Sequence, residues 1–166
     1  MSTRPIRFFG DPILNSAASP VTRFDASLQT LVRDMFDTMA AAGGVGLAAN
    51  QIGVARRVFV FNCQGMRGAL VNPVWRPLGQ AAQTGAEGCL SIPGVRAPVT
   101  RHARVIASGA DVDGRAVTVR ADGLLARCIQ HETDHLDGVL FLARMEPQDR
   151  QAAMAAIRAA DWFQRP

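Results

Sequence analysis

Apolar residues recur at helical spacing in three parts of the chain. The first set follows Asp25, a suitable N-cap, and falls on one face of a helix: Leu28, Leu31, Val32, Met35 and Met39. Glycines at 43, 44 and 46 end this helix, and the glycine-rich sequence from 43 to 53 predicts an irregular loop.

The middle of the chain alternates short apolar runs with turn residues, a pattern typical of β-strands. The predicted strands cover 56–62, 68–74, a stretch around Cys89 to Ile92, 104–110 and 115–121. Asp113-Gly114 predicts a tight turn, so the last two strands should form a hairpin.

A second helical pattern begins after Asp122, another suitable N-cap, and ends at Gly138. A third runs from Pro147 to Ala160, with Met154 and Ile157 facing inward.

These elements predict an α+β fold. Strands bracketed by helices without regular βαβ alternation should give mainly antiparallel short strands packed around a central motif-bearing helix, with N-terminal and C-terminal helices. A chain of 166 residues without repeat or linker is expected to form one catalytic domain spanning 1–166.

Composition narrows the functional classes. The chain is 48% hydrophobic and 19% charged, which is typical of globular proteins. All 18 basic residues are arginines, the net charge is +4, and the arginines are scattered, so direct nucleic-acid recognition is not expected. No apolar run is long enough for a membrane span. Three widely spaced cysteines favour a reducing compartment, and we expect the cytoplasm.

The second helix carries His131-Glu132-Thr133-Asp134-His135, which is an HExxH motif. Imidazoles four residues apart stand on one helix face, about 6 Å apart along the axis, and can converge on one ion. Glu132 lies beside them, where it can exchange a proton with water at the ion. The alternative is a helix in which two histidines share this spacing by chance.

A catalytic site needs a third protein ligand and an open position for water. Position 141 is Phe141, which excludes the HExxHxxGxxH class. Four upstream residues remain as candidates: Cys63, Cys89, His102 and Cys128. Cys128 is seven residues from His135, about 10 Å along the axis, which is too far for one ion. Cys89, flanked by glycine and a Pro-Gly turn, is the leading candidate, with a lone buried cysteine as the alternative.

The sequence resembles the peptide deformylase family. Three stretches are similar, in the same order, to that family's signature motifs: GVGLAANQ at 44–51, EGCLS at 87–91 and QHETDHLDG at 130–138. Further similarity lies in FFGDPIL, LVNP and GVLFLARM, so that nearly the whole chain is covered.

The resemblance implies a metal site and a reaction. The ligands would be Cys89, His131 and His135, and the ion Fe²⁺, replaceable by Zn²⁺, Ni²⁺ or Co²⁺. Water activated there would attack the formyl carbon of N-formylmethionine, while Glu132 accepts its proton and passes it to the departing amine. The Gln51 amide and the Leu90 backbone N–H would stabilise charge on the formyl oxygen.

The resemblance also implies how substrate is bound. The peptide would lie as an added strand along Val45 and Gly46, opposite Gly88. Leu124 and Cys128, with Val45, would line the methionine pocket, and Arg96 matches a family arginine near the site.

The implied partners are N-formylmethionyl peptides, nascent chains and, near its exit tunnel, the ribosome; a bacterial, cytoplasmic monomer is expected. Two departures stand out: Gly94 replaces an acidic residue found in some members, and Arg127 occupies a position that is apolar in others.

Two other functions fit parts of the sequence. A metallopeptidase of another HExxH class would cleave peptide bonds without depending on Cys89. A binding module would hold metal structurally or capture formyl-peptides without turnover, and it would have four protein ligands or lack Glu132 or Gln51.

Overall fold

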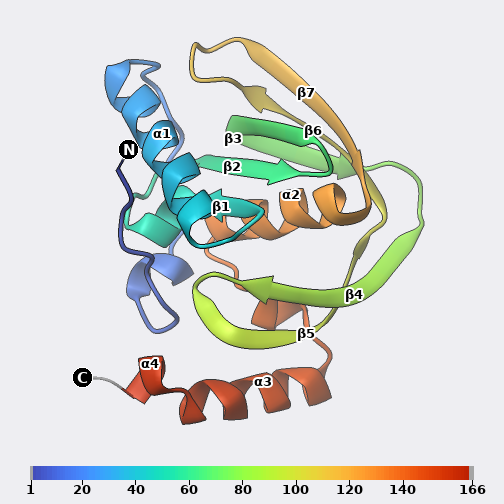
Figure 1. Cartoon of the computed structure of the whole chain (residues 1–166). Helices are drawn as coiled ribbons and strands as arrows, with labels where there is room; N and C mark the ends of the chain where they lie inside the picture. The colour runs from blue at the N-terminus through green and yellow to red at the C-terminus, as the bar shows by residue number, and fades with distance from the viewer. Residues whose placement is uncertain (1, 165–166) are drawn as a thin grey trace.

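The computed structural model describes residues 2–164. Its main unit is a five-stranded antiparallel sheet in the order β1-β2-β3-β6-β7, where β1 spans Gly46–Ala48, β2 Val58–Cys63, β3 Met66–Pro77, β6 Arg104–Ala110 and β7 Ala116–Asp122. A separate hairpin pairs β4, Ala82–Cys89, with β5, Ile92–His102. The expected α+β architecture is therefore confirmed (Figure 1).

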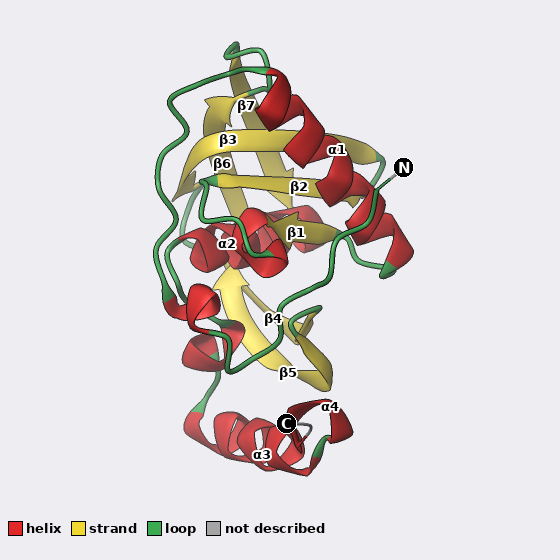
Figure 2. Ribbon diagram, turned by 90° about the vertical axis from the view of Figure 1, so that its left-hand side faces the viewer, coloured by secondary structure: helices red, strands yellow, loops and turns green. Residues whose placement is uncertain are grey.

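Helices cover both faces of the sheet. Side chains alternate along β2: Val58 and Val60 pack with α1, Ala26–Ala41, whereas Phe59 and Phe61 pack with α2, Gly123–Leu136. A third apolar cluster joins β5 to α3, Pro147–Ala159. Consequently α2 lies between the sheet and the hairpin, and α3 lies beyond the hairpin (Figure 2).

The N-terminal helix forms as its pattern predicts. Asp25 is the N-cap, and its carboxylate accepts hydrogen bonds from the backbone N–H groups of Ser27 and Leu28. All five predicted inward-facing residues are buried. The predicted loop after this helix is only partly irregular, because it contains β1 and the short 3₁₀ helix η2, Ala49–Ile52.

The long hairpin is the main difference from the predicted strands. The stretch around Cys89 to Ile92 is not a strand of its own but the end of β4, a turn and the start of β5. The start of α2 also differs: Asp122 occupies the N-cap position without a side-chain hydrogen bond. Gln64 Oε1 accepts the Leu125 N–H instead, at 3.2 Å.

The C-terminal part follows the prediction closely. Pro147 opens α3 at its first turn, and Ile157 is fully buried with Met154 packed against the same cluster. Two short elements in this part are not predicted by the sequence: η3, Phe141–Arg144, and α4, Asp161–Gln164.

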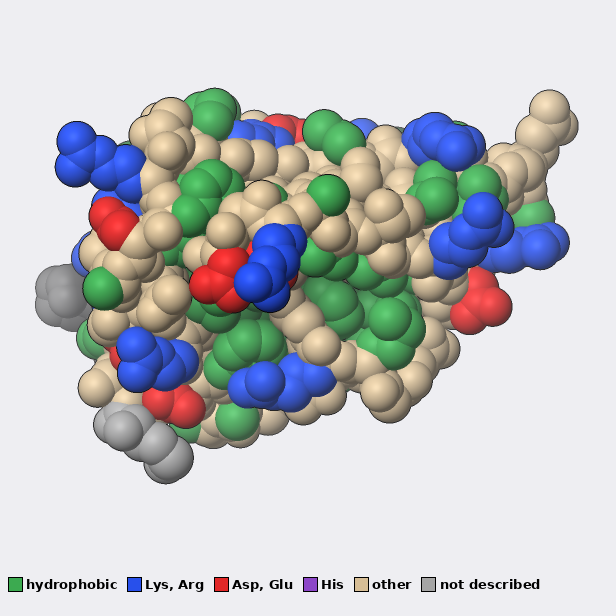
Figure 3. Space-filling model, turned by 90° about the horizontal axis from the view of Figure 1, so that it is seen from above, with side chains coloured by type: hydrophobic (Ala, Val, Ile, Leu, Met, Phe, Trp, Pro, Cys, Tyr) green, Lys and Arg blue, Asp and Glu red, His purple; other side chains and the backbone are tan. Residues whose placement is uncertain are grey.

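The face in Figure 3 shows arginines in separate groups, with apolar side chains and carboxylates between them. Among the helices described, none combines the length and apolar character that crossing a bilayer requires.

Candidate metal centre and catalytic site

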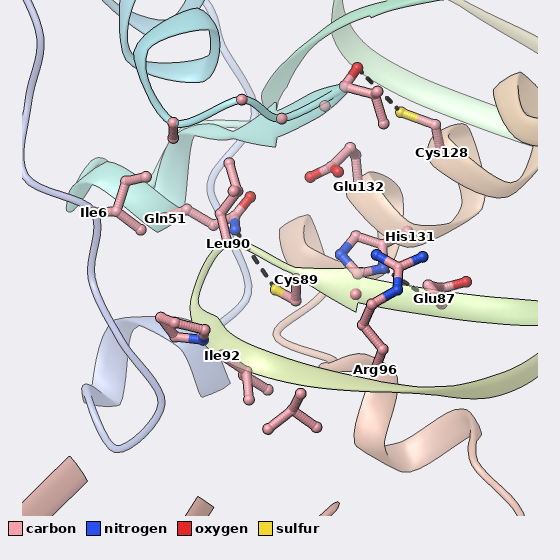
Figure 4. Close-up of a pocket in the computed structure, with 18 of the residues that line it drawn as sticks. Ile6, Gln51, Glu87, Cys89, Leu90, Ile92, Arg96, Cys128, His131 and Glu132 are labelled. Carbon is pink, nitrogen blue, oxygen red and sulfur yellow. Dashed lines mark hydrogen bonds and ion pairs between the residues drawn. The ribbon is translucent and has the colours of Figure 1, made fainter. Parts of the chain in front are cut away.

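The hairpin and α2 bring one cysteine and two histidines together. Cys89 ends β4, while His131 and His135 lie one turn apart on α2. Their ligand atoms lie within 4.8 Å of one another, and Cys89 Sγ is 3.3 Å from His135 Nε2. In Figure 4, Cys89 and His131 point toward a common space below Glu132.

This group fits a divalent cation. With metal–sulfur bonds of about 2.3 Å and metal–nitrogen bonds of about 2.1 Å, tetrahedral ligand atoms lie roughly 3.6 Å apart. The spacing between Cys89 Sγ and His135 Nε2 is close to that value. Three ligands also leave an open coordination position, as catalytic sites require.

Glu87 orients one of the two imidazoles. His131 Nδ1 donates to Glu87 Oε2 at 2.6 Å, which leaves Nε2 free to face the cation position. Burial raises the pKa of Glu87, but hydrogen bonds from His131 and Arg101 outweigh that effect and hold the pKa well below its usual range. Glu87 is therefore a stable carboxylate acceptor for the His131 N–H.

Two arginines complete the surroundings of Glu87. Arg101 Nη2 lies 2.6 Å from Glu87 Oε2, and Arg127 Nη1 lies 2.7 Å from Oε1. All three side chains are buried. The carboxylate therefore accepts charge-assisted hydrogen bonds on both oxygens.

Glu132 has the environment of a proton-transfer group. Its side chain is buried, and Oε1 has no hydrogen-bond partner among residues 2–164. Burial is the main reason that its pKa is raised, to about 7. A carboxyl group with this pKa can both accept and release a proton near neutral pH.

Gln51 and Leu90 both lie beside Cys89 (Figure 4). The Gln51 amide oxygen accepts the Ala48 N–H at 2.9 Å, which aims its Nε2 toward the hairpin. That nitrogen lies 3.1 Å from Ser91 Oγ and 3.8 Å from Cys89 Sγ. Leu90 follows Cys89 in the hairpin turn and faces the same space.

A cavity of about 870 Å³ adjoins this group and is large enough for several residues of a peptide. All six predicted substrate-binding residues line it: Val45, Gly46, Gly88, Arg96, Leu124 and Cys128. Val45 and Leu124 stand at its rim, with 41% and 46% of their surface exposed. Cys128 is buried, and its thiol points to the Val45 carbonyl oxygen at 3.7 Å.

The other candidate ligands lie away from the centre. Cys63 is buried in the apolar cluster under α2, and His102 is exposed beside Trp75, with ring centroids 5.5 Å apart. Three residues around the metal group were not predicted as site residues: Glu87, Arg101 and Arg127. The only sequence clue to Glu87 is its place two residues before Cys89, and nothing in the sequence pairs either arginine with it.

Comparison with known proteins agrees with this geometry. The polypeptide deformylase family model matches residues 3–151. Peptide deformylase 1 of Corynebacterium efficiens is 62% identical over 167 residues, which cover 98% of this chain and 99% of that protein. Peptide deformylase 1 of Corynebacterium glutamicum is also 62% identical over 167 residues, with the same coverage.

Solved structures show the same fold. The peptide deformylase of Ehrlichia chaffeensis in complex with actinonin superposes with a TM-score of 0.90 and 35% identity, covering 95% of this chain and 97% of that one. The Thermus thermophilus peptide deformylase gives a TM-score of 0.88 and 40% identity, covering 95% of this chain and 94% of that one. The chain therefore belongs to the peptide deformylase family, whose members are metal-dependent hydrolases.

Proposed function

We propose that this cavity is where the chain removes the formyl group from N-formylmethionine at the start of a nascent polypeptide, releasing formate. The observation that carries the proposal is the convergence of one cysteine and two histidines beside a buried glutamate. A thiolate and two imidazoles suit a borderline transition metal. We propose Fe²⁺ as the native ion, with Zn²⁺, Ni²⁺ or Co²⁺ as substitutes.

When bound there, the cation supplies Lewis acidity and makes water a nucleophile near neutral pH. Glu132 takes the proton of the attacking water and returns it to the departing amine. Its pKa of about 7 suits both transfers. Since no covalent intermediate forms on the protein, water and formyl-peptide give formate and a free amino terminus.

Two groups are positioned for the charge that develops on the formyl oxygen. The Gln51 side-chain amide lies beside Cys89, and the Leu90 backbone N–H follows Cys89 in the hairpin turn, so each can donate to that oxygen. The Ala48 N–H holds the Gln51 amide in place, which reduces the reorganisation needed during the reaction.

The cavity walls define how a peptide lies in the site. β1 forms one edge of the sheet, so the backbone of Gly46 and of Val45 just before it can pair with an extended substrate, with Gly88 opposite. Leu124 and Cys128 then enclose the methionine side chain. Arg96 stands above Gly88, where its guanidinium donates to the Ala86 carbonyl at 3.3 Å and can support the strand that faces the peptide.

We also propose that the chain works as a monomer in the bacterial cytoplasm, near the ribosome exit tunnel where formylated chains emerge. The relatives named above are bacterial. Gel filtration tests the monomer, and cosedimentation with ribosomes tests the association.

The mechanism is tested by Glu132→Ala. Loss of the proton-transfer group should lower kcat for formyl-Met-Ala-Ser by about 10²- to 10⁴-fold, while metal content stays near stoichiometric. Anaerobic purification with metal analysis and a formate-release assay measures both quantities. Glu146→Ala removes an exposed glutamate far from the cavity and should retain full activity. Wild-type turnover by Glu132→Ala, or peptide-bond cleavage without formate release, would reject the proposal.

A further inference from the structure

The face of α2 that meets the hairpin is polar rather than apolar. The Gln130 amide forms two hydrogen bonds of 3.0 Å with the backbone of His102 in β5. Asp134 accepts a hydrogen bond from Arg101 of β5 at 2.7 Å. Because Cys89 lies on the hairpin and its partner histidines on α2, these contacts set the spacing of the metal group.

Arg127 makes the corresponding contact from the helix toward the hairpin. Its Nη1 donates to Glu87 Oε1 of β4 at 2.7 Å and to the Val99 carbonyl oxygen of β5 at 2.9 Å. One nitrogen thus joins α2 to both strands of the hairpin. Since Glu87 also accepts the His131 N–H, the same contact reaches an imidazole of the metal group.

Stability alone does not account for this arginine. Its exposed fraction is 6%, and Nη2 has no hydrogen-bond partner within residues 2–164. Glu87 already has Arg101 as a counter-charge, which donates to both of its oxygens. Burying a second guanidinium with an unpaired donor is costly, and an apolar side chain could fill this space without that cost.

We propose that Arg127 is a positioning residue for the metal centre. It fixes the hairpin against α2, and thereby holds Glu87 and Cys89 at the distance from His131 and His135 that one cation requires. This inference rests on the proposed function, since it assigns Arg127 a part in building the same site. Arg127 lines the cavity, but it is not one of the three side chains of the metal group.

The test measures cation binding by the full chain with Arg127→Met, which keeps the apolar stem and removes the hydrogen bonds. Competition with a chelator should show that Co²⁺ affinity falls about 10- to 100-fold, the effect expected when a partner behind a metal ligand is lost. The thiolate-to-cobalt absorption band should weaken or shift because Cys89 is no longer held in place. For the loaded enzyme, kcat should fall while KM for formyl-Met-Ala-Ser changes less than about twofold.

Two variants provide the comparison. Arg127→Lys keeps the charge, but its shorter side chain cannot place an ammonium where Nη1 meets both acceptors, so its Co²⁺ affinity should lie between wild type and Arg127→Met. Arg144→Ala removes a half-exposed partner of Asp134 from the same charged group without touching Glu87, and its affinity and spectrum should match wild type.

A wild-type Co²⁺ affinity and spectrum in Arg127→Met would overturn the inference, even if its melting temperature is lower. An equal loss in Arg144→Ala would also overturn it. Should Arg127→Met fail to fold, a wild-type affinity and spectrum in Arg127→Lys would be the overturning result, and an intermediate affinity the supporting one. Formate release by the wild-type chain reports separately on the proposed function.

Discussion

Gly46 in β1 lies directly against two side chains of α2, Cys128 and the proposed general base Glu132. A Cβ atom there would lie 2.6 Å from Cys128 Sγ and 2.7 Å from Glu132 Oε2. Both side chains are buried and line the cavity, so any shift that made room for the Cβ would move the proposed general base or the cavity wall. The absence of a side chain at this position therefore sets where the proposed general base can stand.

Gly46→Ala should displace Glu132 or push β1 away from α2. We expect kcat/KM for formyl-Met-Ala-Ser to fall at least about tenfold, and stability to fall by about 1–3 kcal/mol, as overpacking does. Steady-state kinetics and urea unfolding measure the two effects. Gly85→Ala is a suitable control, because its Cβ would meet only Arg127 Nη2 at an ordinary 3.6 Å. Unchanged kinetics in Gly46→Ala would contradict this account of the site.

The metal-binding residues could be found from the sequence because each stands in a motif with its own spacing. Helix periodicity links His131 and His135, whereas the glycine-rich surroundings of Cys89 make it only the leading candidate, and the family resemblance implies it as the third ligand. Glu87, Arg101 and Arg127 could not be paired in this way. These residues lie on two strands and a helix and are 14 to 40 positions apart in sequence. Which of them meet depends on how the hairpin folds over α2.

At the scale of elements, the N-cap residue Asp25 contributes to the stability of α1 in a way that can be measured. The hydroxyl of Ser27 and the N–H groups of Leu28 and Ser27 donate to its carboxylate and lower its pKa from 3.8. Because the folded-state pKa is depressed, the stabilisation is present above pH 3.8 and is lost as the pH falls through the lowered value.

Asp25→Ala should therefore lower the melting temperature at pH 7, and the difference from wild type should shrink as the pH is lowered below about 4. Thermal unfolding followed by circular dichroism across this range measures the difference. Asp25→Asn keeps a good N-cap and should stay closer to wild type at pH 7. If the difference in melting temperature between Asp25→Ala and wild type instead grows as the pH falls, the charge of the cap does not stabilise the helix as described.

Local strand propensity explains why the sequence does not predict β4. β4 reads AQTGAEGC, with two glycines and no β-branched residue except Thr84, so its sequence carries little strand propensity. It is a strand because β5 pairs with it from Ala82 to Cys89. The α1 helix needed no such partner to be recognised, since its apolar face is visible in the sequence itself.

For the molecule as a whole, the proposed cation would join two parts with separate cores. The hairpin packs with α3 in one apolar cluster, and α2 packs with the sheet in another. Cys89 stands on the first part, and the two histidines on the second. A cation bound by all three would therefore stabilise the native arrangement and have much weaker affinity for the unfolded chain.

Adding Ni²⁺ to the metal-free chain at about 100 times its dissociation constant should stabilise the fold by about 2.7 kcal/mol. For a domain of this size that corresponds to a rise in melting temperature of about 5 to 10 °C. Differential scanning calorimetry with and without Ni²⁺ measures the shift. Cys89→Ala should lose most of it, because the two remaining ligands lie on one helix and no longer connect the two cores. Cys63→Ala removes a buried thiol outside the metal group, so this variant should melt at a lower temperature yet keep the full Ni²⁺ shift. If Cys89→Ala shows a shift as large as that of wild type, the cation does not bridge the hairpin and the helix.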